Sequence, residues 1–309
     1  GRPIKATWGI LGDGKTAVIE SAAASGLALL KPSDYNPELT STKGTGLLIK
    51  EALDNGFRNL LIGLGDSATN DGGVGLGRAL GIIPLDETGR TIHEGGAALS
   101  NLHSFDISKV HPSLTELKTT VLCDVKNTLC GLNGSAHIFG PQKGASLEQI
   151  FKLDHALANF ARVVKTQFNK DVIDIPGAGA GGGLGAGLMG LCNATLKPGF
   201  EVISEAINLT KLIEDADIVI TGEGRLDKST PDGKGVAGIS NIAKSCGVKH
   251  VLAIVGSTDL ETQQYRNLGI DQVFALNNSK EAPIPSPAKT PILIEKTALL
   301  AITTLMDGV

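Results

Sequence analysis

The sequence lacks the features that mark several classes of protein. Its four cysteines include no C-x-x-C pair, so nothing in their spacing indicates a zinc site. No apolar run approaches the length of a membrane span. The net charge is −4, and no basic cluster or aromatic ladder is present. We therefore expect neither nucleic acid nor membrane as a partner, and we expect free thiols in a reducing cytoplasm.

Glycine is the residue that the chain has in excess. There are 40 glycines among 309 residues, whereas the usual share is about 7%. Apolar residues make up 41% and charged residues 19%, which is typical of a folded globular protein. The chain is long enough for one large domain or two ordinary ones. The glycines cluster, and these clusters carry most of the functional information.

Alternating strand and helix patterns predict an α/β fold with a Rossmann-like parallel sheet. Residues 45–56 have helical periodicity, RNLLIGLG follows as a buried strand, and another helix begins after a glycine-rich loop. We expect one discontinuous Rossmann-like domain from residues 40–82 and 200–309, and an inserted α/β lobe at 83–199. Residues 1–39 are expected to form a hairpin and linker. The active site is expected in the cleft between the two lobes; a simple break near residue 195 is the alternative.

Two short motifs match nucleotide-binding patterns without the required context. Residues 9–16 satisfy G-x-x-x-x-G-K-[ST], but the β-branched run TAVIE follows instead of a helix, which predicts a hairpin. Gly177, Gly179 and Gly182 satisfy G-x-G-x-x-G, but no acidic residue follows at the spacing that NAD binding requires. For this second run, a backbone-amide cradle for an anion is favoured. Close backbone packing or a hinge is the structural alternative.

The stretch GLGDSATNDGG lies between a buried strand and a helix. Ligands of open α/β sheets bind at the carboxyl ends of the strands. Gly63 and Gly65 would let the backbone approach phosphate oxygens, Ser67 and Thr69 offer hydroxyl donors, and Asp71 could hold Mg²⁺. Helix capping would account for one such residue, whereas five occur together.

A second polar segment, TGEGRLDKSTPDGKG at 221–235, follows the strand DIVI. Glu223, Arg225, Asp227 and Lys234 fall within a dozen positions. Mixed charges at a strand end suit phosphoryl transfer, in which cations neutralise the moving group and a carboxylate accepts the hydroxyl proton. A solvated surface loop with weakly paired charges is the alternative.

Six segments together resemble the signature segments of bacterial glycerate kinases. They are GKTAVIESAAASGL (14–27), TSTKGTG (40–46), GLGDSATNDGG, FGPQKGA (139–145), PGAGAGGGLGAG (176–187) and TGEGRLDKSTPDGK (221–234). The similarity runs from the first residue nearly to the last, in the family's order. It implies phosphoryl transfer from ATP to glycerate with Mg²⁺, the making of 2-phosphoglycerate, and two α/β domains with the active site between them.

The chain departs from the family pattern in three ways. Asp66 stands where the family usually has glycine, and a carboxylate there would repel ATP phosphates. Lys126 and Thr128 are unusual in CDVKNTLCG. The family's additional first segment, with a DGGEGT-like loop, is not in this sequence. A non-catalytic or truncated ligand-binding remnant is therefore the alternative function, and an NAD dehydrogenase is a distant third.

The residue patterns and the resemblance together assign roles in catalysis. The residues expected to contact ATP phosphates are Gly63, Gly65, Ser67, Thr69 and Asn70. Asp71 or Glu223 would bind Mg²⁺. Asp227 is expected to accept the hydroxyl proton of glycerate, with Asp71 as second choice. Arg225 or Lys234 would meet the substrate carboxylate or the transferring phosphoryl group.

Four further residues are expected to contact glycerate. Glu20 and Asp124 stand at apparent strand ends, and Gln142 and Lys143 belong to the GPQKG segment. For Lys143, a surface lysine is the alternative interpretation. We expect the protein to act as a monomer or a homodimer.

Overall fold

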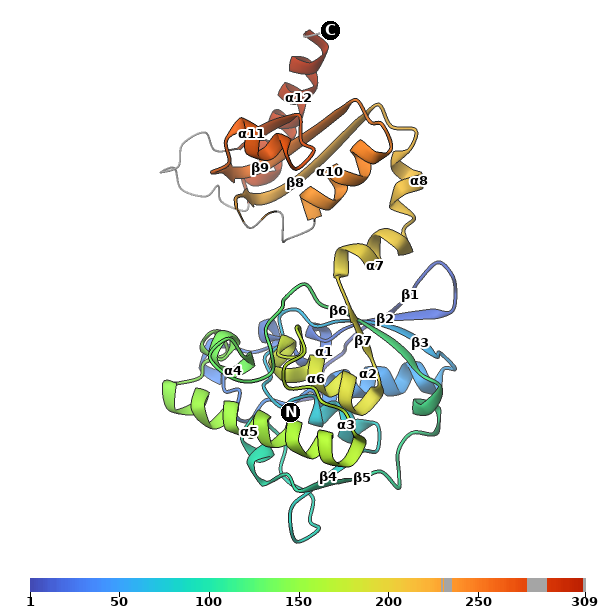
Figure 1. Cartoon of the computed structure of the whole chain (residues 1–309), viewed down its shortest axis with the longest axis vertical. Helices are drawn as coiled ribbons and strands as arrows, with labels where there is room; N and C mark the ends of the chain where they lie inside the picture. Colours follow the sequence, from blue (N-terminus) through green and yellow to red (C-terminus); the bar gives the residue numbers. More distant parts are fainter. Residues whose placement is uncertain (229, 231–234, 277–287, 308–309) are drawn as a thin grey trace. The chain divides into compact units, whose positions relative to one another are not determined.

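The structure is a computed structural model that describes residues 1–228, 230, 235–276 and 288–307. Its contacts divide the chain into two compact units, Gly1–Gly199 and Phe200–Val309. Each unit is a mixed α/β structure built on a parallel sheet, which confirms the predicted fold class (Figure 1).

The first unit contains a five-stranded sheet in the order β1-β2-β3-β6-β7. The strands are β1 (Gly9–Ile10), β2 (Thr16–Glu20), β3 (Asn59–Gly63), β6 (Lys118–Leu122) and β7 (Thr195–Lys197). Strands β2, β3, β6 and β7 run parallel, whereas β1 pairs antiparallel with β2 at the edge. This pair confirms the predicted hairpin and excludes a phosphate-binding helix after Lys15.

Four longer helices and several short elements surround this sheet. The longer helices are α2 (Lys43–Asp54), α3 (Val74–Ala79), α5 (Leu147–Phe168) and α6 (Ala180–Cys192). The short elements are α1 (Ala22–Ser25), η1 (Leu27–Leu29), η2 (Pro32–Asp34), β4 (Ile83–Leu85), η3 (Gly96–Asn101), β5 (Ser104–Asp106), η4 (Pro112–Glu116), α4 (Ser135–Phe139) and η5 (Pro141–Lys143). Helix α2 packs on β2 and α3, α6 packs on β6 and β7, and α5 packs on α6 and η3.

The core of the first unit follows from the alternation of its strands. Leu60, Ile62 and Val121 are buried, while their neighbours in β3 and β6 are partly exposed. Phe160 of α5 and Leu184 of α6 complete the same cluster and are fully buried. Burying a side chain of this size stabilises the fold by roughly 1.5–3 kcal/mol.

Helix α6 has an irregular start that the glycine-rich sequence predicted. Gly181, Gly182 and Gly183 have φ values of 65°, 77° and 83°, a left-handed conformation that favours glycine. A Cβ atom on Gly187 would overlap the carbonyl oxygen of Gly72. The glycines therefore let α6 approach the loop after β3, which confirms close backbone packing as one reason for the glycine-rich run.

The second unit contains a three-stranded parallel sheet in the order β10-β9-β8. Its elements are α7 (Gly199–Ala206), α8 (Leu209–Ile213), β8 (Ile218–Leu226), α10 (Gly235–Ser245), β9 (His250–Thr258), α11 (Thr262–Arg266), β10 (Gln272–Ala275) and α12 (Thr290–Asp307). Strand β9 lies centrally, and Val251, Leu252 and Ala253 are buried in succession, as a parallel strand covered on both faces requires.

The strand pairing differs from the expected discontinuous domain. Strand β3, within residues 40–82, pairs with β2 and β6 of the first unit, and the strands after residue 200 form their own sheet. Alternation along the sequence identifies strands but does not tell which sheet each one joins, which is why the expected assignment failed. The alternative break near residue 195 lies close to the observed boundary after Gly199.

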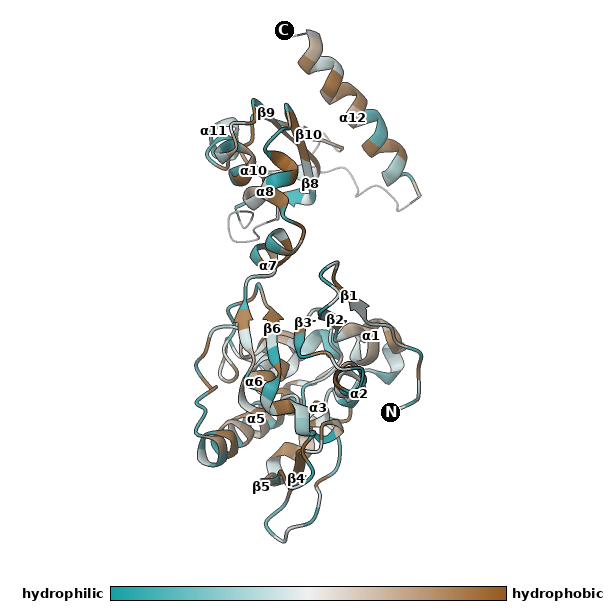
Figure 2. Ribbon diagram, turned by 90° about the vertical axis from the view of Figure 1, so that its right-hand side faces the viewer, coloured by the Kyte–Doolittle hydropathy of each residue, from teal (hydrophilic) through white to brown (hydrophobic). Residues whose placement is uncertain are grey.

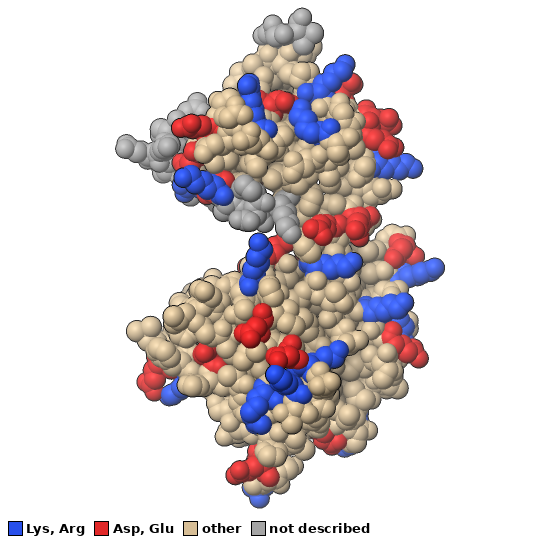
Figure 3. Space-filling view, in the orientation of Figure 1, with Lys and Arg blue, Asp and Glu red and all other residues tan. Residues whose placement is uncertain are grey.

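The surface of the protein carries exposed apolar residues on α12 and mixed charges elsewhere. Apolar residues run along much of α12, where Ile292, Leu299, Leu300 and Met306 are exposed (Figure 2). Basic and acidic side chains are interspersed over the face of each unit seen in Figure 3. Within the described part of the chain, no helix combines the length and apolar character that crossing a bilayer requires.

Candidate active site

A pocket of about 270 Å³ lies in the first unit, at the carboxyl ends of β3 and β6. Its lining comes from the loop after β3, the loop after β6, the α4–η5 segment and the start of α6. The lining residues are Leu64, Gly65, Asp66, Ser67, Leu122, Cys123, Asp124, Val125, Phe139, Gln142, Lys143, Ala180 and Gly181. This is the edge of the sheet at which ligands of parallel α/β folds bind.

The pocket gathers five of the predicted site residues. Gly65 and Ser67 follow β3, Asp124 follows β6, and Gln142 and Lys143 belong to η5. These positions are far apart in sequence, and the parallel pairing of β3 with β6 brings two of the loops together. Some of the residues predicted to contact phosphate thus meet some of those predicted to contact glycerate in one cavity.

Lys143 is the most unusual side chain of the pocket. It is 2% exposed, and its Nζ donates a hydrogen bond to the Thr69 carbonyl oxygen at 2.7 Å. Burial lowers the pKa of Lys143 to about 7, and the charge of Asp71 opposes this shift. The residue is therefore not a surface lysine.

The hydroxyl groups of the loop after β3 form an internal network. The Ser67 and Thr69 hydroxyl oxygens lie 2.8 Å apart, and Ser67 Oγ donates to the Gly181 carbonyl oxygen at 3.0 Å. The network ties the loop to the start of α6. Ser67 consequently lines the pocket in a fixed position.

Asp124 is fixed by the backbone at the end of the first unit. Its Oδ1 accepts a hydrogen bond from the Gly199 amide at 2.9 Å. A Cβ atom on Gly199 would lie 2.9 Å from Oδ2, so a larger residue there would shift the carboxylate. Asp124 thus presents a positioned carboxylate at the pocket.

Asp71 lies outside the pocket lining and is 1% exposed. One oxygen accepts from the Thr42 amide at 2.8 Å, the Thr42 hydroxyl at 2.9 Å and the Gly75 amide at 3.1 Å, and the other accepts from the Gly73 amide at 3.2 Å. Burial raises the pKa of Asp71, and these four hydrogen bonds oppose the shift. The geometry favours a carboxylate that joins the starts of α2 and α3, rather than a ligand for Mg²⁺.

Several other expected contacts do not line the pocket. Glu20 is exposed at the end of β2, and the Gly63 carbonyl oxygen accepts from the Ser21 amide. Thr69 contributes its carbonyl oxygen to Lys143. Asn70 is fully buried, and its amide nitrogen and oxygen have no hydrogen-bond partner within the described ranges. We expect such a buried amide to have a functional or structural partner.

The predicted residues of the second unit lie in and after β8. The strand continues to Leu226, so Glu223 and Arg225 are within it and not in a loop. Arg225 pairs with Asp259 and lies 3.5 Å from Asp227, and Glu223 accepts from the Thr230 hydroxyl at 2.8 Å. Alternate positions along a strand point to one face, which places these side chains together. Lys234 lies outside the described residues.

The described residues contain no group of three or more His, Cys, Asp or Glu side chains that could hold a metal ion. Other lining residues were not among the predicted site residues, and they include Cys123, Phe139 and Ala180. Phe139 directly precedes the GPQKG segment, so its position beside Gln142 and Lys143 was a usable signal. Cys123 and Ala180 are small residues that reach the pocket because they lie at the end of β6 and at the start of α6.

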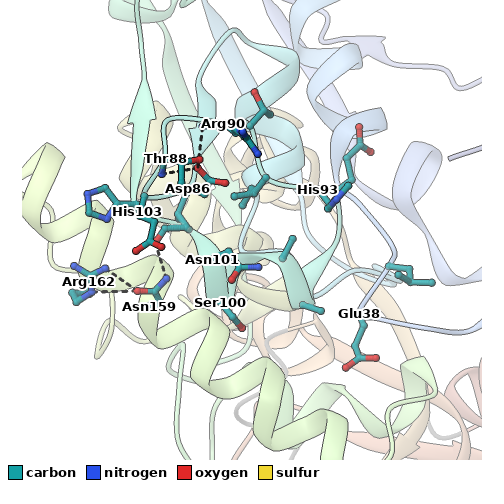
Figure 4. A pocket seen from close by; sticks show the side chains of 18 residues that line it. Glu38, Asp86, Thr88, Arg90, His93, Ser100, Asn101, His103, Asn159 and Arg162 are labelled. Atoms are coloured by element: carbon teal, nitrogen blue, oxygen red, sulfur yellow. Dashed lines mark hydrogen bonds between the residues drawn. The ribbon is translucent and has the colours of Figure 1, made fainter.

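A larger hollow of about 940 Å³ in the first unit contains none of the predicted site residues (Figure 4). Asp86 accepts from Thr88 and from the Arg90 amide, while Arg162 donates to Asn159. Two further carboxylates of the hollow are engaged by residues outside its lining, since Glu94 pairs with Lys43 and Glu38 accepts a hydrogen bond from Gln149. The smaller pocket, with its buried lysine, is the better candidate site.

Comparison with known proteins identifies the family of the chain. The model of the glycerate kinase family matches residues 1–306. The chain is 47% identical to the glycerate 2-kinase of Escherichia coli (strain K12), over 90% of this chain and 73% of that protein. It is 46% identical to the glycerate kinase of Halalkalibacterium halodurans, over 89% and 72%.

A solved structure from Salmonella typhimurium LT2, assigned there as a glycerate kinase 2, has the same fold. It superposes with a TM-score of 0.83 at 39% identity and covers 100% of this chain and 81% of that one. The match includes both units and the segments that line the pocket. The chain belongs to the glycerate kinase family.

Proposed function

We propose that the protein transfers the γ-phosphoryl group of ATP to a hydroxyl of glycerate and yields 2-phosphoglycerate. As a member of the glycerate kinase family the chain is a phosphotransferase, and its relatives at 45–47% identity are named for the phosphorylation of glycerate. The name of the Escherichia coli relative supports the 2-position. The observation that carries the proposal is the pocket that joins Ser67, Asp124 and Lys143.

The pocket has groups for both ends of glycerate. Lys143 and the amide of Gln142 can meet a carboxylate or a phosphoryl oxygen, and the left-handed start of α6 offers backbone amides to an anion. Asp124 can accept a hydrogen bond from a glycerate hydroxyl. Because catalysis of phosphoryl transfer is mostly positioning and charge stabilisation, such fixed groups are the main contribution that the chain can make.

MgATP is the second substrate of the proposed reaction, and the metal arrives with the nucleotide. Both carboxylate oxygens of Asp71 already accept hydrogen bonds from the protein, which does not fit a metal ligand. Glu223 is therefore the carboxylate that we propose to contact Mg²⁺. We keep Asp227 as the proposed proton acceptor, with Arg225 and Lys234 as cations for the phosphoryl group. Mutation of each, with turnover as the readout, tests these four assignments.

The location that we propose is the cytoplasm. All four cysteines are free thiols. Free thiols are the usual state in a reducing compartment, whereas exported proteins tend to form disulfides.

The test of the proposed function is product identification. The protein is incubated with D-glycerate and MgATP, and product is detected by enolase coupling with and without phosphoglycerate mutase. We expect a signal from enolase alone, because enolase acts directly on 2-phosphoglycerate. A signal that needs the mutase would assign the 3-position. Binding of MgATP without any product would favour a non-catalytic member of the family, and absence of both would overturn the proposal.

Asp66 gives a prediction about substrate affinity. It lines the pocket with φ of 55°, a left-handed conformation that Asp adopts at some cost and glycine adopts freely. We expect both Asp66→Gly and Asp66→Asn to lower the Kd of D-glycerate or MgATP about three- to tenfold, because each removes a like charge. Only the glycine variant should also gain stability, up to about 1 kcal/mol.

Isothermal titration and urea unfolding separate the two effects of Asp66. The asparagine variant is the matched control, since it removes the charge and keeps a side chain that tolerates the left-handed region. Unchanged Kd values in both variants would show that the carboxylate does not face bound substrate.

A further inference from the structure

The pocket contains a buried lysine that forms no ion pair with a carboxylate among the described residues. Lys143 Nζ has one hydrogen bond, to the neutral Thr69 carbonyl oxygen, and no ion pair to it occurs within the described residues. A buried ammonium without a paired carboxylate carries a large desolvation penalty, and lysines in this situation release their proton. The neutral amine is therefore the form that this environment favours.

The charged and titratable groups around Lys143 set the direction of its response. Asp71 attracts a proton to the lysine from within the first unit. Asp66, Asp124 and the Cys123 thiol line the same pocket. Burial outweighs the attraction of Asp71 and lowers the pKa of Lys143 to about 7. An added negative charge next to Nζ would raise it again, because opposite charges stabilise each other strongly in a desolvated site.

Lys143 also stands where an incoming anion would be held. It shares the pocket with Gln142 and with Ala180 and Gly181 at the start of α6. Substrates of the proposed reaction are anions, namely the carboxylate of glycerate and the phosphates of MgATP. Either one would bring its negative charge into the cavity that Lys143 lines.

We propose that Lys143 is a neutral amine in the unliganded protein and takes up one proton from solvent when a substrate anion enters the pocket. This inference rests on the proposed function for the identity of the anion. The step is balanced: a buffer acid loses a proton, the Lys143 nitrogen gains an N–H bond, and an ammonium–anion pair forms. Lys143 is then a substrate-contacting residue that carries a positive charge when the anion is bound and none when the pocket is empty.

Calorimetry in buffers of different ionisation enthalpy measures this proton. D-glycerate and MgATP are titrated separately into the full chain at pH 6 and pH 8, so that the two arms identify which anion is responsible. We expect uptake approaching about one proton per bound anion at pH 8 and far less at pH 6, since at pH 6 the lysine is already protonated. Lys143→Met should abolish the uptake and weaken binding at least tenfold. Lys143→Arg should also abolish it, because arginine stays charged.

A second measurement does not depend on the proposed function. The folded protein binds the Lys143 proton more weakly than the unfolded chain, whose lysine has the ordinary pKa of 10.5 against about 7 in the pocket. The wild type should therefore gain urea resistance relative to Lys143→Met as the pH rises from 7 towards 10. Lys152→Met is the control: Lys152 is exposed and Glu148 raises its pKa, so no such trend is expected.

The outcomes separate this inference from the proposed function. Anion binding with no buffer-dependent heat at pH 8, or with equal uptake in Lys143→Met, overturns the inference and leaves the kinase activity standing. No binding and no turnover overturns the proposed function. In that case a flat pH dependence of the stability difference also overturns the neutral lysine, whereas a rising one supports it.

Discussion

Gly182→Ala is expected to lower the free energy of unfolding by about 3–5 kcal/mol, the largest effect of any glycine substitution near the pocket. Gly182 has φ of 77°, and a Cβ atom there would overlap the Thr69 carbonyl oxygen. Backbone cannot rotate away as a side chain can. Because that carbonyl accepts from Lys143, the displaced backbone should also weaken substrate binding.

Urea unfolding of Gly182→Ala and Gly12→Ala measures this effect. Gly12 is the matched control, since nothing lies within 4 Å of a Cβ atom there. The control should change the stability by less than about 0.5 kcal/mol. Similar unfolding midpoints for the two variants would contradict the close packing of α6 on the loop after β3.

Asp71→Ala is expected to destabilise the protein by on the order of 4 kcal/mol, because four donors to the carboxylate lose their acceptor in a buried site. These donors are the Thr42 amide and hydroxyl and the amides of Gly73 and Gly75. Asp71→Asn should cost less, about 1–2 kcal/mol, since one amide oxygen can still accept most of these hydrogen bonds. Both values come from urea unfolding.

The same pair of variants distinguishes a structural Asp71 from a metal ligand. If Asp71 holds the starts of α2 and α3, the folded Asn variant should need no more Mg²⁺ for activity than the wild type. A stable Asn variant with a strongly raised Mg²⁺ requirement would instead support the role expected from the sequence.

The sequence was most informative where local pattern and sheet geometry agree. The hairpin at 9–20, the strand at 59–63 and the helix at 43–54 follow from β-branched runs, turn residues and helical periodicity. Helix α6 was harder, because its glycines lower helix propensity and the packing against Gly72 and Gly73 overrides it. Strand β8 extends beyond its apolar part because β9 pairs with it through Leu226.

The candidate site was predictable in its loops but not in the state of each side chain. The sequence placed Gly65, Ser67 and Lys143 in segments that meet at one pocket. It could not reveal that backbone amides and the Thr42 hydroxyl donate to Asp71. An aspartate in a glycine-rich loop has the same sequence signature whether it accepts hydrogen bonds at a helix start or binds a metal ion. Burial, which lowers the pKa of Lys143, likewise depends on contacts between distant segments.

Glycerate is proposed to occupy the pocket between the ends of β3 and β6, and alkylation of Cys123 tests this placement most directly. Cys123 lines the pocket, whereas Cys246 is a partly exposed thiol of the second unit. Labelling rates at both are followed by peptide mass spectrometry, with and without saturating D-glycerate and a non-hydrolysable ATP analogue. We predict that glycerate slows the labelling of Cys123 at least fivefold and leaves Cys246 unchanged. An unprotected Cys123 at a glycerate concentration that saturates turnover would contradict the account.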